Sequence, residues 1–424
     1  MELTPSRQIL FNKMMDTIRK NYEKFGFLPI DTPAIEKSEV LLAKGGGETE
    51  KQIYRVVKGD TKMSLRFDLT VPLARYVSQH YSELSFPFRR YHIAKVYRGE
   101  RSQRGRFREF YQADIDIIGN GSLDIINDAE IPSVIYTTFK DLGFDNFTIR
   151  INNRKVLTGF FSHLGISDVQ IVMRAIDRLE KVGLESVIDE LRENELNEEQ
   201  IKGIVEFISI DGDSDQIIER LKEMKVEDAT FKLGVEELEV VVKYLELFGV
   251  PRSNYCVDLT IARGLDYYTG TVYETILNDY PSIGSVCSGG RYDDLASHYI
   301  TQNLPGVGIS IGLTRLFYQL EDAGVITAEG CHLSKVLVIP MDGFSSEAIE
   351  LAADLRNKDI SAQVYLEEAK IGKKFNYADK LGIPFTIVIG EEEKASGKYT
   401  LKDMDSGEQK LLTFEELAEV IMED

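Results

Sequence analysis

The chain has 424 residues, 43% of them hydrophobic, and a formal net charge of −20. This length predicts two or three domains, and the hydrophobic fraction is ordinary for a globular protein with a core. The sequence has no apolar run of membrane-spanning length and no signal-like N-terminus, and its three cysteines (Cys256, Cys287 and Cys331) lie far apart. We therefore expect a cytoplasmic protein with no membrane partner, no disulfide framework and no zinc site.

A helix followed by a short strand is predicted at the N-terminus. Thr4 and Pro5 are residue types typical of an N-cap and a first helical position, and apolar residues then recur on one helical face. Gly26 can end this helix. Residues 27–32 have the pattern of a strand, which Pro33 ends.

Residues 63–70 are predicted to form another strand, and Val71 begins the helix that follows. Asp68 and Thr70 are two positions apart, so on a strand both side chains point to the same face. Two interpretations of Asp68 stay open from the residues alone. It is either a carboxylate that binds a ligand or a capping residue in a turn.

The most basic stretch of the chain, residues 91–119, is predicted to be a β-hairpin. Two runs of alternating apolar residues flank a polar break that contains glycine. Five arginines lie around this break, with Glu100 as the acid among them. They are Arg98, Arg101, Arg104, Arg106 and Arg108. A loop this basic in an acidic chain predicts an anionic partner, and a local basic patch is compatible with nucleic acid.

From residue 152 to about residue 250, helical periodicity and charged residues dominate, and no catalytic constellation is visible. Gly203, Gly212 and Gly234 are predicted to separate short helices. We expect a helical insertion between two halves of a larger domain.

Sheet-like sequence returns at residues 255–259, and two short motifs follow. RGLDYY occupies residues 263–268, and SGGRYD occupies residues 288–293. We expect the two glycines of the second motif, Gly289 and Gly290, to let a substrate lie against the backbone.

A strand of small residues is predicted to run into a helix over residues 305–316. The glycine spacing is GxGxxxG, which differs from the GxGxxG of a dinucleotide-binding fingerprint. After a linker near residues 323–334, strands and helices alternate, which predicts a small α/β domain with a largely parallel sheet. Its expected strands are 336–339, 362–366 and 385–389, and its expected helices are 345–358, 375–381 and 414–421.

Several of these stretches resemble the signature motifs of class II aminoacyl-tRNA synthetases, in the form used by histidyl-tRNA synthetases. Residues 97–116, YRGERSQRGRFREFYQADID, resemble motif 2, and the helix–strand unit ending at Pro33 resembles the dimer-forming motif 1. RGLDYY and GGRYD resemble two motifs peculiar to histidyl-tRNA synthetases. Residues 306–315 fit motif 3, with Thr314 where the family commonly has glutamate. The resemblance covers nearly the whole chain.

The resemblance implies an α+β fold: a class II antiparallel-sheet catalytic domain with a helical insertion, plus a C-terminal α/β anticodon-binding-type domain. On this basis residues 1–160 and 251–325 form the two parts of the catalytic domain. Residues 161–250 form the insertion, over the tRNA acceptor arm by analogy, and residues 334–424 form the anticodon-binding domain. Lys370, Lys373 and Lys374 then lie near the RNA face of that last domain.

The activity implied is histidine activation with ATP, followed by transfer to tRNA(His). Activation joins a carboxylate to the α-phosphate, so fixed cations are needed where negative charge develops. The resemblance gives this role to Arg98 and Arg263. Mg²⁺ would be carried by ATP rather than by a protein metal site. The expected ATP-binding residues are Arg98, Glu100, Arg106, Phe110 and Arg315, with Arg315 and Phe110 stacking on the two faces of adenine.

The histidine pocket must distinguish imidazole from other rings. A carboxylate that accepts from one ring N–H suits this purpose, and the resemblance places Asp116 there with Tyr268 at the second nitrogen. Gln112, Asp68 and Thr70 would hold the ammonium group. Arg263, Tyr267 and Tyr292 complete the expected histidine-binding set.

The motif 2 loop is expected to contact tRNA through Arg101 and Gln103, and the protein is expected to be a homodimer through motif 1. Two other functions stay open. One is a non-catalytic paralogue, the regulatory subunit of ATP phosphoribosyltransferase, and the other is a tRNA-binding sensor with a dead active site. Both alternatives are expected to lose catalytic arginines, and the regulatory subunit also the C-terminal domain. This chain keeps Arg98, Arg263 and Arg315 and an anticodon-binding-like domain, which favours the enzyme.

Overall fold

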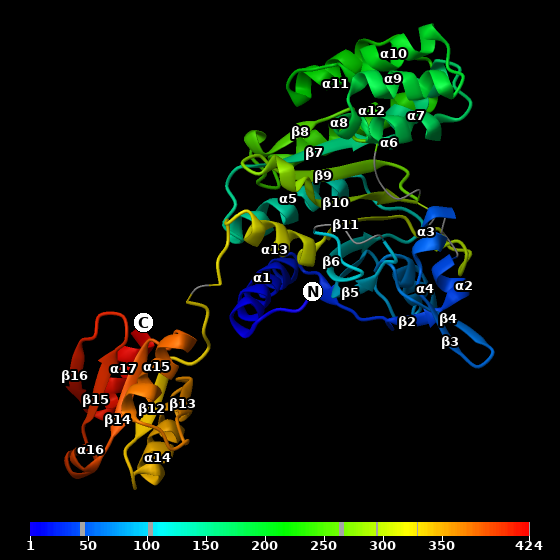
Figure 1. Ribbon diagram of the computed structural model, residues 1–424. Coiled ribbons are helices and arrows are strands. Elements are labelled where there is room, and N and C mark those ends of the chain that lie inside the picture. The colour runs from blue at the N-terminus through cyan, green and yellow to red at the C-terminus, as the bar shows by residue number, and fades with distance from the viewer. Residues whose placement is uncertain (43–46, 101–104, 263–266, 294–295, 329, 424) are drawn as a thin grey trace. The chain divides into compact units, whose positions relative to one another are not determined.

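The computed structural model describes residues 1–42, 47–100, 105–262, 267–293, 296–328 and 330–423 (Figure 1). The chain divides into two compact units, one of Met1 with Met14–Val325 and one of Glu2–Lys13 with Ile326–Asp424. Within the described residues, none of the helices combines the length and apolarity that crossing a membrane requires.

A mixed, mostly antiparallel sheet forms the centre of the first unit (Figure 1). Among the described strands of this sheet, only the outer pairs β1–β5 and β7–β8 are parallel. This sheet confirms the expected α+β class. Its strands, in spatial order, are β1 (Leu28–Pro29), β5 (Phe88–Tyr97), β6 (Glu109–Ile118), β11 (Gly306–Ile311), β10 (Ser285–Tyr292), β9 (Thr271–Leu277), β7 (Phe147–Asn153) and β8 (Tyr255–Val257).

Strands β5 and β6 form the predicted hairpin, with Phe88 opposite Ile118 and Tyr97 opposite Glu109. Alternate residues face opposite sides of the sheet. On one side Ala113, Ile115 and Ile117 are fully buried, and the hydroxyl of Tyr22 from α1 (Pro5–Lys24) donates to the Ala113 carbonyl at 3.0 Å. Helix α5 (Ile126–Asp141) also packs on this side, against β10 and β11. The opposite side carries polar residues and is left to form a pocket.

A second sheet of three strands lies beside the hairpin, in the order β2 (Ile35–Lys37), β4 (Thr61–Leu65) and β3 (Arg55–Lys58). It is accompanied by α2 (Ser38–Leu42), α3 (Gly47–Gln52) and α4 (Val71–Gln79).

Two of the strand predictions in this region were wrong in extent. Strand β1 covers two residues rather than 27–32. The strand expected over residues 63–70 ends at Leu65, because the side chain of Asp68 accepts the Val71 N–H at 3.0 Å and starts α4. Asp68 and Thr70 therefore do not share a strand face, although both reach the same pocket. Asp68 makes the turn bond expected of one interpretation, while its other oxygen is unpartnered in the pocket, so a ligand-binding role stays a prediction.

Between β7 and β8 the described chain is helical, as predicted. Gly203 and Gly234 lie inside helices rather than between them, so that prediction was wrong for both. A Cβ on Gly234 would lie 2.6 Å from the Val156 nitrogen, so the glycine lets two helices cross closely. The helices are α6 (Arg154–His163), α7 (Val169–Asp177), α8 (Leu179–Val182), α9 (Leu184–Glu193), α10 (Glu198–Ile208), α11 (Ser214–Glu223) and α12 (Ala229–Leu245), followed by a 3₁₀ turn at Arg252–Asn254.

The second unit contains a five-stranded sheet. The three predicted strands are present and parallel, but two antiparallel strands extend the sheet, so the expectation of a largely parallel sheet was incomplete. The order is β13 (Ala362–Val364), β12 (Val336–Pro340), β14 (Phe385–Ile389), β15 (Tyr399–Asp403) and β16 (Gln409–Leu412). The helices are α14 (Ser345–Asn357), α15 (Ile371–Leu381), α16 (Glu391–Ser396) and α17 (Phe414–Glu423).

Lys374 is not available to an RNA partner in this fold. Its side chain is buried, and Nζ donates to the Pro340 carbonyl at 2.8 Å while lying over the Tyr365 ring. The prediction for Lys374 was therefore wrong, because the ammonium group satisfies the end of β12. Lys370 and Lys373 are exposed.

Candidate active site

A pocket of about 440 Å³ lies on the polar side of the large sheet. Its floor is made by β6, β11 and β10, and its rim by the residues that precede α4, the end of β5 and the start of α13 (Leu313–Asp322). In register, Asp116 is opposite Gly308 and Asp114 is opposite Ser310, so the floor alternates carboxylates with small residues.

One end of the pocket is cationic. Arg98 donates from Nε to the Phe67 carbonyl at 3.1 Å, and its guanidinium lies over the Phe67 and Phe110 rings at 5.1 and 5.2 Å. Both contacts leave the remaining guanidinium N–H groups for another acceptor. All five residues expected to bind ATP line this pocket, namely Arg98, Glu100, Arg106, Phe110 and Arg315.

The loop residues at this end are paired with each other in the structure. Arg106 donates from Nη1 to the Glu100 carboxylate at 3.2 Å, and Arg106 is half exposed.

Arg315, in the first turn of α13, donates to the Ile283 carbonyl at 3.3 Å. Thr314, where the family commonly has glutamate, accepts the Tyr111 N–H at 2.8 Å and so ties α13 to β6.

The other end of the pocket is acidic and aromatic. Tyr267 lies between Tyr268 and Tyr292, with ring centroids 5.0 and 6.0 Å away. The described residues expected to bind histidine all line the pocket here: Asp68, Thr70, Gln112, Asp116, Tyr267, Tyr268 and Tyr292.

Three buried carboxylate or amide oxygens at this end have no hydrogen-bond partner among the described residues. They are Oδ2 of Asp68, whose other oxygen accepts the Val71 N–H, Oε1 of Gln112, whose amide nitrogen donates to Ser310 at 2.7 Å, and Oδ1 of Asp114. A buried acceptor without a partner is costly, so these atoms are suited to receive the N–H groups of a cationic ligand.

Arg90 does not line the pocket itself but pairs with a residue of its floor, and the sequence did not reveal it. It is fully buried, forms an ion pair with Asp116 and donates to the Leu69 carbonyl at 3.3 Å. Asp116 also accepts the Tyr292 hydroxyl at 2.8 Å. The hairpin prediction began one residue later, at Tyr91. Extending the alternation by one position would have placed Arg90 opposite Asp116.

Burial raises the pKa of both carboxyl groups on the pocket floor, those of Asp114 and Asp116. It raises the pKa of Asp114 to about 7 and that of Asp116 to about 6, and Arg90 opposes both shifts. Burial likewise raises the pKa of Asp68. Asp68, Asp114 and Asp116 all interact electrostatically with Arg90, and Asp68 also with Arg98, so a cationic ligand bound beside these buried carboxyl groups would favour their ionised forms.

The glycines of the pocket allow their strands to pack closely against neighbouring atoms. A Cβ on Gly289 would lie 2.1 Å from the Gly308 carbonyl oxygen, and one on Gly290 would lie 2.7 Å from that of Thr271. A Cβ on Gly308 would lie 2.4 Å from an oxygen of Asp116. Gly289 and Gly290 also line the pocket, and that a substrate lies against their backbone stays a prediction.

Three predicted site residues, Arg101, Gln103 and Arg263, lie outside the described residues. Within the described part of the chain, no group of three or more His, Cys, Asp or Glu side chains is arranged to hold a metal ion.

Comparisons with known proteins agree with this geometry. A family model described as histidyl-tRNA synthetase matches residues 1–316, and one described as anticodon binding domain matches residues 335–424. The histidine--tRNA ligase of Clostridium tetani is 64% identical over 422 residues, which cover 99% of this chain and 96% of that protein. The histidine--tRNA ligase of Finegoldia magna is 48% identical over 419 residues, covering 99% and 97%.

Solved structures give the same relationship. The crystal structure of histidyl-tRNA synthetase from Nostoc sp. has a TM-score of 0.92 at 42% identity and covers 100% of this chain and 97% of its own. A protein from Bacillus halodurans described as an ATP phosphoribosyltransferase regulatory subunit/histidyl-tRNA synthetase has a TM-score of 0.73 at 20% identity, covering 89% and 94%. At that identity the likeness shows the fold alone.

The pH dependence of stability should report the buried carboxylate of Asp114. Its pKa in the folded protein lies above its ordinary value, so its contribution to stability is complete at low pH and is lost as the pH rises through about 7. Asn cannot ionise. Asp114→Asn should therefore gain stability relative to the parent between pH 5 and pH 8, by a few kcal/mol at most, since one pKa unit corresponds to about 1.4 kcal/mol.

Melting temperatures of the ligand-free proteins at pH 5 and pH 8 measure this difference. Asp189→Asn, which removes an exposed carboxylate from α9, is the control. An Asp114→Asn effect of equal size at both pH values would contradict the prediction.

Proposed function

We propose roles for individual residues from the premise that the chain belongs to the histidyl-tRNA synthetase family. The chain is a histidine--tRNA ligase, an enzyme that uses ATP to attach histidine to tRNA. A function as regulatory subunit of ATP phosphoribosyltransferase is not favoured, because the full-length relatives that this chain matches at high identity are histidine--tRNA ligases. One observation supports the residue roles most strongly: the pocket has a cationic end and an anionic end within a single cavity.

In the proposed activation step the cationic end holds ATP. Arg98 binds the α-phosphate and the histidine carboxylate, because a guanidinium fork contacts such oxygens bidentately and keeps its charge. Arg263 approaches the same phosphate from the other side. Arg106 releases Glu100 and meets the terminal phosphate, while Arg315 and Phe110 enclose the adenine. Mg²⁺ would be carried by the ATP phosphates, and Glu100 is the residue that would help to hold it.

The anionic end holds histidine. Its ammonium group is received by Asp68 and Gln112, each of which has a buried oxygen without a partner, together with Thr70. The imidazole ring lies among Tyr267, Tyr268 and Tyr292 and donates one N–H to Asp116. This places the histidine carboxylate toward Arg98, in position to attack the α-phosphate and release pyrophosphate.

Transfer to tRNA(His) is proposed to use the remaining parts of the chain. Arg101 and Gln103 contact the tRNA in the motif 2 loop. The division into catalytic residues 1–160 and 251–325, a helical insertion at 161–250 and an anticodon-binding domain at 334–424 remains a proposal. Lys370 and Lys373 are exposed on the last domain and suit an RNA contact. We place the enzyme in the cytoplasm.

Histidine-dependent exchange between ATP and pyrophosphate tests the activation step directly. Arg98→Ala and Arg263→Ala should each lower kcat by roughly 10²–10³-fold with little change in KM for ATP, since each removes a donor that acts on the developing charge. Arg108→Ala is the matched control, because Arg108 is an exposed arginine of the same hairpin that does not line the pocket. Parent-like exchange in Arg263→Ala would show that its assignment is wrong.

Asp116 should determine histidine affinity. Asp116→Ala leaves the imidazole N–H without an acceptor, a loss of roughly 1–3 kcal/mol in histidine binding. Asp116→Glu should bind histidine better than Asp116→Asn, because glutamate keeps a charge against the buried Arg90. Calorimetric titration with histidine, and separately with a non-hydrolysable ATP analogue, measures both effects. Equal histidine affinity in Asp116→Ala and the parent would mean that another residue reads the ring.

We also propose that the enzyme is a homodimer through motif 1. Leu28 on β1 is 59% exposed and Ile35 on β2 is 47% exposed, as expected of an apolar surface that a second copy covers. Light scattering at micromolar concentration should give twice the chain mass, and Leu28→Asp should lower it. A monomer mass for the parent would exclude this dimer.

A further inference from the structure

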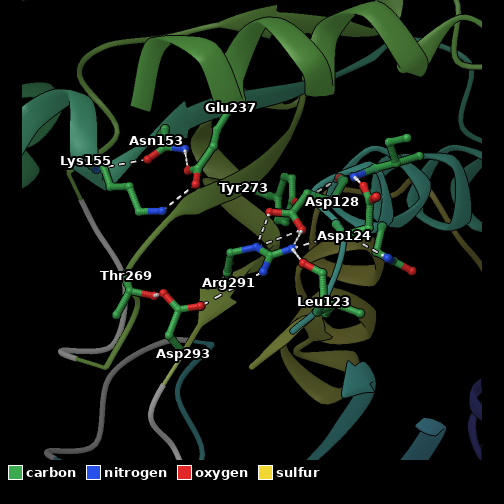
Figure 2. Close-up of polar contacts among 12 residues, drawn as sticks. Leu123, Asp124, Asp128, Asn153, Lys155, Glu237, Thr269, Tyr273, Arg291 and Asp293 are labelled. Carbon is green, nitrogen blue, oxygen red and sulfur yellow. Dashed lines mark hydrogen bonds and ion pairs between the residues drawn. The ribbon is translucent and has the colours of Figure 1, made fainter. Parts of the chain in front are cut away.

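The arginine of the GGRYD motif, Arg291, does not face the pocket. Successive residues of β10 point to opposite sides of the sheet, so Tyr292 enters the pocket and Arg291 faces α5 (Figure 2). Arg291 is 5% exposed and Asp128, in the first turn of α5, is fully buried. None of the roles assigned above uses either residue.

Arg291 is held by four acceptors from the start of α5. Its Nε donates to the two carboxylate oxygens of Asp128 at 3.1 and 3.0 Å, and its Nη2 donates to Oδ1 at 2.7 Å. Nη2 also donates to the carbonyls of Leu123 and Asp124 at 3.1 and 3.2 Å (Figure 2). A paired charge with this many bonds fixes the end of β10 against α5.

The same arginine fixes the segment that follows Tyr268. Its own carbonyl accepts the Thr269 N–H at 2.9 Å. The next residue, Gly270, lies against its side chain, since a Cβ there would be 2.9 Å from Cδ of Arg291. The Thr269 hydroxyl donates to Asp293 at 2.6 Å, and Asp293 lies 4.0 Å from the guanidinium (Figure 2).

A second anchor holds the other side of this segment. The Gly270 carbonyl accepts the Arg154 N–H at 2.9 Å, at the start of α6. On either side of Arg154, Asn153 and Lys155 both bond to Glu237 of α12 (Figure 2). Thr269 and Gly270 are thus held between α5 and the helices that follow β7, immediately after the two pocket tyrosines.

We propose that Arg291 is a positioning residue for histidine, which sets Tyr267, Tyr268 and Tyr292 in place through Thr269, Gly270 and its own backbone. This inference rests on the proposed assignment of those tyrosines to the histidine pocket. The ATP end is held by other contacts, those of Arg98 with Phe67 and of Arg315 with Ile283. Loss of the Arg291 contacts should therefore act on histidine and not on ATP.

The test uses Arg291→Met/Asp128→Asn, which removes both charges together and so leaves no uncompensated buried charge. In ATP–pyrophosphate exchange this variant should raise KM for histidine by roughly tenfold or more, with KM for ATP within roughly twofold of the parent. Arg89→Met/Glu130→Gln is the matched control. It removes another arginine–carboxylate pair that joins β5 to the same helix α5 and should change neither constant.

Thr269→Val gives an independent measurement with the ion pair intact. It removes the hydroxyl bond to Asp293 and should raise KM for histidine by a smaller factor, without changing KM for ATP. If the double variant does not fold, this variant decides. A merely structural role for Arg291 predicts a lower melting temperature with both KM values unchanged or equally changed, and that result would overturn the proposal. Absence of exchange in the parent would instead reject the proposed function.

Discussion

The ion pair between Arg90 and Asp116 is the constraint on which the pocket depends. Both charges are removed from water, so the pair is stable only while β5 and β6 keep the register that places them opposite each other. A slip of one strand by one residue would turn Arg90, or Asp114 and Asp116, toward the side of the sheet on which α1 and α5 pack. Because Asp116 also accepts from Tyr292, the register of β5 and β6 determines where an aromatic wall from β10 lies.

The floor is poised electrostatically for a cation. Asp68, Asp114 and Asp116 all interact electrostatically with Arg90, Asp68 also with Arg98, and burial raises the pKa of all three carboxyl groups. A ligand with an ammonium group supplies the missing positive charge at one end, while its carboxylate is directed to the arginines at the other end. The separation of charge within one cavity thereby orients an amino acid before any chemistry takes place.

Much of the fold could be predicted from the sequence, because short-range patterns of apolar and small residues determine these elements. The hairpin, the small-residue strand before α13 and the helical stretch after β7 follow from alternation, glycine content and helical periodicity. What the sequence did not reveal depends on partners distant along the chain. Arg90 meets Asp116 across a turn, and Arg291 meets Asp128 from 163 positions away. Lys374 was predicted to be a surface residue because nothing nearby in sequence indicates that Pro340 accepts from it.

The close contacts of the pocket glycines limit how the site can change. Gly289 and Gly308 are separated from neighbouring main-chain or carboxylate oxygens by distances that no Cβ can occupy. At these two positions the pocket wall therefore consists of main-chain atoms. Replacing either glycine with a larger residue would push β10 away from β11 or displace Asp116. An inhibitor that binds against this wall would contact glycines that cannot be replaced without disrupting the substrate site. A single substitution there that weakened the inhibitor would therefore also damage the enzyme.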